Sequence, residues 1–170
     1  MAKETKRMTE QQLVLFDLAT EHYAIDSMNV REIIRMQTIT KIPGAPMSVE
    51  GVVNLRGKVT PVLDLRKRLG FPVSENTRET RIVVVEVDGQ DVGLIVDGVS
   101  EVLRIPVSVI EPTSTIVAAE EADYILGVAK LETKLVILLD VGRLLLGGEK
   151  RVSLGAERGG GQLAAAAPVS

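Results

Sequence analysis

An internal duplication constrains the fold of this chain more than any other feature of its sequence. Residues 51–65 return as residues 127–141, displaced by 76 positions, with glycine, valine, leucine, lysine and aspartate at matching places. Residues 12–36 match residues 81–105 without a gap, at a displacement of 69. The two displacements differ by seven residues, so the second copy carries a lengthened loop in its middle. The chain therefore consists of two copies of one unit.

The size of each copy indicates that the two copies fold as one body. A unit of roughly 70 residues buries too little surface to be very stable alone, whereas the whole chain of 170 residues is 45 % apolar. We expect a first unit at about 11–72 and a second at about 80–147. The polar residues 1–10 are typical of a flexible arm, and the Gly- and Ala-rich residues 148–170 of a disordered tail.

The composition excludes several classes of function. The chain has no cysteine and a single histidine, His22, which excludes disulfides, thiolate zinc sites, multi-histidine metal sites and a catalytic triad. A net charge of −3 and only four aromatic residues argue against nucleic acid as a partner. No apolar run approaches the roughly 20 residues that cross a bilayer, and the start lacks a signal-peptide core. We predict a cytoplasmic protein without membrane insertion, metal or cofactor.

The first unit opens with a predicted hairpin. Residues 13–18 and 23–25 are typical strands, joined by a turn at residues 19–22. From Asp26 the apolar period changes to that of a short helix, with Asp26 or Ser27 as its cap. This helix would turn Met28, Val30, Ile33 and Ile34 inward, and Asn29, Arg31, Glu32 and Arg35 toward solvent.

Short strands dominate the rest of both units. Arg56-Gly57 and Asp88-Gly89 are turn signals between paired strands, and residues 99–105 fit either a strand or a helical turn. Further strands are expected at residues 49–55, 58–63, 81–87, 90–96, 126–131 and 134–139, with the long loop at residues 106–123. About five strands and little helix per half favour one small closed barrel in each half. The apolar runs at residues 83–85 and 135–139 predict strands that are covered on both faces, hence a core shared between the halves.

One aspartate recurs in each copy just before a short helical pattern. We interpret Asp64 and Asp140 as helix caps, for helices at residues 65–69 and 141–146. The alternative is a catalytic dyad shared between two lobes. The sequence around both aspartates lacks the small hydroxyl and glycine residues that orient such a dyad, so the caps are favoured.

The two copies differ most at the turn of their second hairpin. Arg56 and Gly57 in the first copy become Glu132 and Thr133 in the second, so the charge is reversed. Arg56 is therefore either free to vary as a turn residue or specific to the first half, where a planar guanidinium can meet a partner's carboxylate or carbonyl groups. The apolar Val30 and Ile33 nearby fit a core stripe or an exposed binding patch.

Several motifs in this order resemble the CheW family of bacterial chemotaxis coupling proteins. The matching residues are the run Gly51 to Gly57, the run Pro61 to Leu65 and the run Gly93 to Leu103. The resemblance covers about residues 11–147. It implies a mainly β fold of two SH3-like five-stranded β-barrels that share a hydrophobic core, with a few short helices.

The resemblance also implies a function. Such a protein is a non-enzymatic adaptor that links the cytoplasmic tips of methyl-accepting chemoreceptors to the histidine kinase CheA. The regulatory domain of that kinase has the same fold and pairs with the coupler barrel to barrel, at receptor clusters on the inner face of the membrane. Carried over by motif, the receptor groove between the barrels takes Val30, Glu32, Ile33, Asn54, Leu55, Arg56 and Gly57.

Three alternatives remain at this point. The first is a paralogous coupler that serves a non-motility chemosensory pathway. The second is a coupler fused to a receiver domain, although these 170 residues show no receiver-like alternation of strands and long helices. The third is of another class, namely a small-molecule-binding barrel or a hydrolase that uses Asp64 and Asp140.

Overall fold

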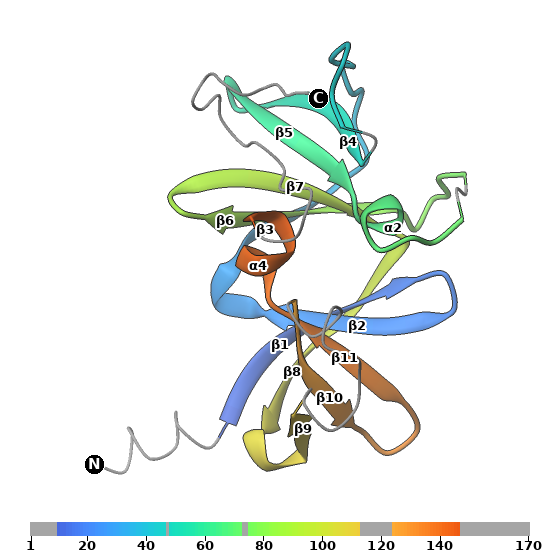
Figure 1. The fold of residues 1–170 in the computed structure, drawn as a ribbon, viewed down its shortest axis with the longest axis vertical. Helices are drawn as coiled ribbons and strands as arrows, with labels where there is room; N and C mark the ends of the chain where they lie inside the picture. Colours follow the sequence, from blue (N-terminus) through green and yellow to red (C-terminus); the bar gives the residue numbers. More distant parts are fainter. Residues whose placement is uncertain (1–9, 47, 73–74, 113–123, 147–170) are drawn as a thin grey trace.

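The chain folds into two curled β-sheets with little helix (Figure 1). The computed structural model describes residues 10–46, 48–72, 75–112 and 124–146. The expected arm and tail lie outside these residues, apart from Glu10, which begins the first strand. The strands are β1 (Glu10–Leu18), β2 (Glu21–Asp26), β3 (Val30–Arg35), β4 (Val49–Leu55), β5 (Lys58–Asp64), β6 (Arg81–Val87), β7 (Gln90–Val96), β8 (Gly98–Pro106), β9 (Ile110–Pro112), β10 (Ile125–Lys130) and β11 (Leu135–Leu139). The helices are α2 (Leu65–Arg68), α4 (Val141–Leu146) and the single 3-10 turns η1 (Ser27–Asn29) and η2 (Val107–Val109).

Each sheet takes strands from both sequence copies. One sheet has the order β8-β1-β2-β11-β10-β9 and the other has the order β3-β6-β7-β5-β4. The first hairpin of each copy joins the other copy's strands through a parallel pair, β2 with β11 and β7 with β5. The expectation of one barrel per half is therefore wrong.

Both sheets close by the same device. In the five-stranded sheet, the chain beyond β3 returns so that Thr40 pairs with Val52 of edge strand β4. In the six-stranded sheet, the chain beyond β8 returns through η2 as β9 and pairs with β10. A glycine stands at each closure, where a Cβ on Gly51 would lie 2.1 Å from the Thr40 carbonyl oxygen and a Cβ on Gly127 2.4 Å from that of Glu111. This close backbone approach explains why the duplication keeps both glycines.

Three apolar clusters fill the molecule. The largest lies between the sheets and takes Phe16 and Ile25 from one sheet and Val83 and Val85 from the other. A second cluster fills the six-stranded sheet and a third fills the five-stranded sheet, where Val84 is buried. Val83, Val84 and Val85 thus alternate between two cores, which confirms the predicted strand that is covered on both faces. The shared core is the junction between the two barrels.

The predicted helix after Asp26 is wrong beyond its first turn. Asp26 caps η1 through its Oδ1, which accepts a hydrogen bond from the Met28 amide at 2.9 Å. The chain then enters β3, antiparallel to β6. The register shifts between Val30 and Glu32, so a β-bulge at this point sets Val30 and Ile33 three residues apart on one face of the strand. That spacing imitates the period of a helix.

Other local expectations fare better. Residues 99–105, for which the sequence allowed a strand or a helical turn, lie in strand β8. The β-bulge of β8 repeats the one in β3. Asp64 caps α2, and Asp140 caps α4 through a hydrogen bond from the Arg143 amide at 3.1 Å.

The first hairpin turn is shorter than expected, because His22 already belongs to β2 and only two residues separate the strands.

Candidate functional site

The turn between β4 and β5 is built by its own residues. Arg56 has a φ of 51° and Gly57 a φ of 83°, so both central residues are left-handed, as a two-residue type I′ hairpin requires. The Asn54 Oδ1 accepts a hydrogen bond from the Gly57 amide at 2.9 Å. A left-handed conformation is uncommon for arginine. The turn therefore fixes the backbone of Arg56 at some conformational cost.

Arg56 uses this position to reach across to β3. Its two terminal nitrogens donate to the two carboxylate oxygens of Glu32, with Nη2 to Oε1 at 2.6 Å. The hydrogen bonds from Arg56 lower the pKa of Glu32, and Glu32 in turn raises the pKa of Arg56. The Arg56 side chain is 74 % exposed, whereas that of Glu32 is 24 % exposed. The pair is a charged, oriented surface feature that links the two edge strands of one barrel.

Strand β3 distributes the predicted receptor residues over two faces. Val30 and Ile33 pair with Val85 and Val83, which belong to the core between the barrels, so both lie on the junction face. Glu32 pairs with Val84 and faces the interior of the five-stranded barrel, close to its rim. The expectation that Glu32 points to solvent beside Arg31 is therefore wrong, because the bulge reverses the alternation. Leu55 is partly buried against the interior core of the same barrel.

The corresponding turn of the second copy is built differently. No left-handed residue occurs at Glu132 or Thr133, and the turn is held by a hydrogen bond from the Leu131 amide to the Lys134 carbonyl at 2.9 Å. Glu101, the counterpart of Glu32, pairs with Lys134 at 3.7 Å. The sequence comparison identified the charge reversal at the turn but missed this ion pair, which uses a lysine that both copies carry.

Asp64 and Asp140 both have an arginine partner in addition to the helix amide that each caps. The partner of Asp64 is buried, whereas that of Asp140 is exposed. Both carboxylate oxygens of Asp64 accept from the buried Arg66, each at 2.9 Å. Arg66 also donates to Asp97 at 2.9 Å, and these carboxylates raise its pKa. Asp97 in turn accepts a hydrogen bond from the Ala19 amide at 2.6 Å, so one arginine joins α2 to the turn between β1 and β2. The counterpart of Arg66 in the second copy is Gly142, and Asp140 is more exposed.

The two aspartates thus have different partners, which disfavours a shared catalytic dyad. Both oxygens of Asp64 are occupied by the buried Arg66, whereas Asp140 caps α4 and lies beside Arg143. The described part of the chain holds no group of three or more histidine and acidic side chains that suits a metal ion. None of its helices is long and apolar enough to span a bilayer.

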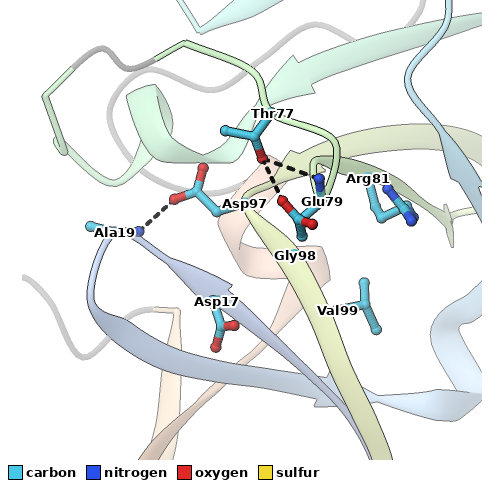
Figure 2. A pocket seen from close by; sticks show the side chains of 8 residues that line it. All are labelled: Asp17, Ala19, Thr77, Glu79, Arg81, Asp97, Gly98 and Val99. Carbon is cyan, nitrogen blue, oxygen red and sulfur yellow. Dashed lines mark hydrogen bonds between the residues drawn. The ribbon is translucent and has the colours of Figure 1, made fainter.

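A hollow of about 390 Å³ opens beside the junction between the barrels (Figure 2). Asp17, Glu79, Asp97 and Arg81 line it, and all three carboxylates already have partners, Glu79 through a hydrogen bond from the Thr77 hydroxyl at 3.3 Å. Asp17 binds the His22 Nδ1 at 2.8 Å, and Asp97 holds the Ala19 amide. Four of its eight lining residues are charged, and it has few of the apolar walls that small-molecule sites prefer, so this hollow does not favour a small-molecule site.

Exposed apolar side chains mark a further pair of surfaces that the sequence did not predict. Val59 is 73 % exposed and Leu135 is 60 % exposed. They occupy matching positions in the two copies, each just after the second hairpin turn. The duplication could have predicted these surfaces, because both copies keep an apolar residue at a position where a solvated hairpin would have a polar one.

Known proteins are similar to this chain over most of its length. The sequence profile of the CheW-like domain matches residues 12–147. Chemotaxis protein CheW of Bacillus subtilis is 36 % identical over 137 residues, which is 81 % of this chain and 88 % of that protein. Protein FrzA of Myxococcus xanthus is 31 % identical over 71 % of this chain and 75 % of its own length. The crystal structure of the scaffolding protein TtCheW from Thermoanaerobacter tengcongensis is 40 % identical, with a TM-score of 0.74, and the alignment covers 82 % of this chain and 96 % of that one.

Proposed function

The chain belongs to the CheW-like family, and on that premise we propose that it is a non-enzymatic adaptor that couples the cytoplasmic tips of chemoreceptors to the histidine kinase CheA. The names of its relatives, chemotaxis protein CheW and scaffolding protein, support this role. Its place in the cell would be the cytoplasm, at receptor clusters on the inner face of the membrane.

The observation that carries the proposal is the pair of Glu32 and Arg56. It occurs in one copy only, although the closure of the barrel needs it in neither, because the second copy closes with Glu132 at the turn. A largely exposed arginine that is oriented by a carboxylate suits contact with another protein better than it suits packing.

The receptor surface would consist of the seven residues named from the sequence. Ile33 and Arg56 are its accessible members, at 37 % and 74 % exposure. Glu32 and Asn54 orient Arg56, through the ion pair and the turn. The half-buried Val30 and Leu55 would fix the shape of the strand and the turn, and Gly57 permits the left-handed turn.

The kinase would use the ends of the barrels. Val59 and Leu135 present equivalent apolar patches on two barrels of the same architecture. A partner that also carries such barrels can bury one of these patches against its own, and burial of apolar area is the main driving force for association of this kind. One chain thereby has one surface for the receptor and others for the kinase.

A paralogous coupler for a different chemosensory pathway is the second candidate, and the similarity to protein FrzA favours it. The two candidates share a mechanism and differ in the receptors they serve.

Co-sedimentation tests the proposal. The purified chain is mixed with vesicles that carry a chemoreceptor encoded in the same genome, with and without the histidine kinase. We expect the chain to pellet with the receptor vesicles, and the kinase to pellet only when the chain is present. Binding of the kinase without the chain, or a chain that stays in the supernatant, would contradict the proposal.

A further inference from the structure

Met28 is the most exposed of the large apolar side chains that the structure describes. It is 88 % exposed, ahead of Val59 at 73 %. It lies in the turn η1, where the chain passes from the six-stranded sheet into the five-stranded sheet (Figure 1). The expectation from the sequence that Met28 turns inward is therefore wrong, because the helix that would have buried it does not continue beyond η1.

The backbone that carries this side chain is held in place. The Asp26 carboxylate accepts a hydrogen bond from the Met28 amide at 2.9 Å and another from the Gln11 Nε2 at 3.0 Å. The Val30 amide donates to the Ser27 carbonyl and closes the turn. A chemical change in the exposed side chain of Met28 leaves all these hydrogen bonds intact.

The matching crossover of the second copy shows that the fold does not need an apolar side chain at this point. Asp97 is the counterpart of Met28, and it is the single residue between β7 and β8. Its carboxylate accepts hydrogen bonds from Arg66 and from the Ala19 amide. The crossover therefore tolerates a polar group, and the methionine of the first copy contributes little to packing.

An exposed thioether is accessible to oxidants. A peroxide has to reach the sulfur atom, so an exposed methionine reacts before a covered one. Met36, the other methionine in the described residues, is half-buried against the interior core of the five-stranded barrel. The product is methionine sulfoxide, which is polar and which reductases convert back to methionine. Met28 is thus accessible to a reversible modification that leaves the fold unchanged.

The position of Met28 connects this modification to the proposed receptor surface. Only Asn29 separates it from Val30, where β3 begins. A methionine adapts to apolar partners because its side chain is flexible and polarisable. A sulfoxide at the same place loses hydrogen bonds to water when a partner covers it. Oxidation of Met28 would therefore weaken contact with a protein that covers this margin of the surface.

We propose that Met28 is a reversible oxidation site through which a peroxide lowers the affinity of this chain for its receptor. In the forward step a peroxide oxygen forms a bond with Sδ while the O–O bond breaks. The sulfur loses two electrons and the peroxide gains them, and the leaving hydroxide takes the proton of the new S–OH group to become water. In the reverse step a methionine sulfoxide reductase removes the oxygen as water while two thiols form a disulfide. The inference rests on the proposed function, because the receptor is the partner whose affinity changes.

Treatment of the chain with hydrogen peroxide tests the inference. Catalase removes the excess peroxide, and mass spectrometry maps the oxidised methionines. Met28 should be oxidised at least about fivefold faster than Met36. The oxidised chain should keep its melting temperature and bind vesicles that carry a chemoreceptor from the same genome about tenfold more weakly. Incubation with a methionine sulfoxide reductase should restore the binding.

Two leucine variants assign the effect to one residue. Met28→Leu keeps an apolar side chain without sulfur, so peroxide treatment should not change its binding. Met36→Leu is the matched control and should lose binding after treatment as the unaltered chain does. Met28→Gln has a polar side chain of similar length and should reproduce the loss without peroxide.

The outcomes separate the inference from the adaptor role. If the untreated chain binds the receptor vesicles and the chain oxidised at Met28 binds equally well, the inference falls while the adaptor role stands. The inference also falls if Met36 is oxidised first, if oxidation lowers the melting temperature, or if treatment weakens Met28→Leu as much as the unaltered chain. If the untreated chain does not bind, both fall.

Discussion

The turn between β4 and β5 and the turn between β10 and β11 occupy matching positions in the two copies. They differ in how a cation is placed beside the glutamate of the facing strand. Both copies keep a glutamate on the strand that faces the turn, Glu32 or Glu101. In the first copy the cation comes from the turn itself, and Arg56 is the exposed partner of a mostly covered glutamate. In the second copy it comes from Lys134, the residue just before β11, which is the covered partner, 25 % exposed, of a glutamate that is 45 % exposed.

The difference separates what the barrel requires from what the first copy adds. Both copies pair the strand glutamate with a cation, but only the first copy carries that cation on the turn. The first copy places an arginine in an uncommon left-handed conformation and leaves most of it exposed. Because this feature is costly for the backbone and absent from the second copy, we propose that it serves a partner.

The largest expected effect concerns the glycines that the copies share. Gly51→Ala and Gly127→Ala should each destabilise the fold by more than about 3 kcal/mol, because the new Cβ would overlap a backbone carbonyl oxygen. Gly51→Ala should be the worse, since its φ of 147° is also strained for alanine. Urea unfolding measures both. Gly142→Ala, in α4, is the control and should be neutral or stabilising. A mild effect of both closure variants would refute the common closure device.

The next effect distinguishes the two capping aspartates. Asp64→Ala should cost about 3 kcal/mol, because it leaves the buried Arg66 short of its main partner. Asp140→Ala should cost about 1 kcal/mol, the usual value of a lost cap. Asp140→Asn keeps a capping oxygen and serves as the control. Equal losses in thermal unfolding would show that the arginine on α2 adds nothing beyond the cap.

A smaller effect on stability is expected at the turn. Arg56→Glu should leave the melting temperature within about 2 °C of the original, because an exposed ion pair contributes little to folding. Calorimetry of Arg56→Glu, Glu32→Arg and the double variant measures the coupling directly. A large drop for Arg56→Glu would instead make the arginine a structural residue, and the contrast between the two turns would lose its functional meaning.

The smallest effect is electrostatic. Arg56 holds the pKa of Glu32 below its ordinary value, so the pair stabilises the fold fully above that value, and the contribution disappears as the pH falls through the lowered pKa. A carbon-detected NMR titration between about pH 2 and 6 should show Glu32 titrating lower in the original chain than in Arg56→Gln. Identical titration in both would mean that the pair does not form in solution.

The sequence predicted the parts of the fold that depend on local chemistry and on the duplication. The hairpin at Asp88-Gly89, the caps at Asp64 and Asp140 and the strand at residues 83–85 follow from turn residues, cap residues and an unbroken apolar run. The exchange of hairpins between the barrels could not be predicted, because the sequence of a strand does not indicate which strand it pairs with in parallel.

The errors around β3 have a specific cause. A β-bulge sets Val30 and Ile33 three residues apart on one face, and a spacing of three is also the mark of a helix. Because of the same bulge, the sequence pattern did not reveal that Glu32 faces the barrel interior or that it forms an ion pair with Arg56. The ion pair of Lys134 with Glu101 and the network of Arg66 with Asp97 depend on contacts between segments far apart in sequence, which periodicity cannot reveal.

Receptor-stimulated phosphorylation by the kinase, reconstituted on receptor vesicles, tests the central claim most directly when Arg56→Glu and Glu132→Arg are compared. If the first copy's turn meets the receptor and the second copy's turn does not, Arg56→Glu should lose at least about tenfold of the stimulation, while Glu132→Arg keeps it and both variants stay folded. Equal stimulation by the two variants, or an equal loss in both, would contradict the account.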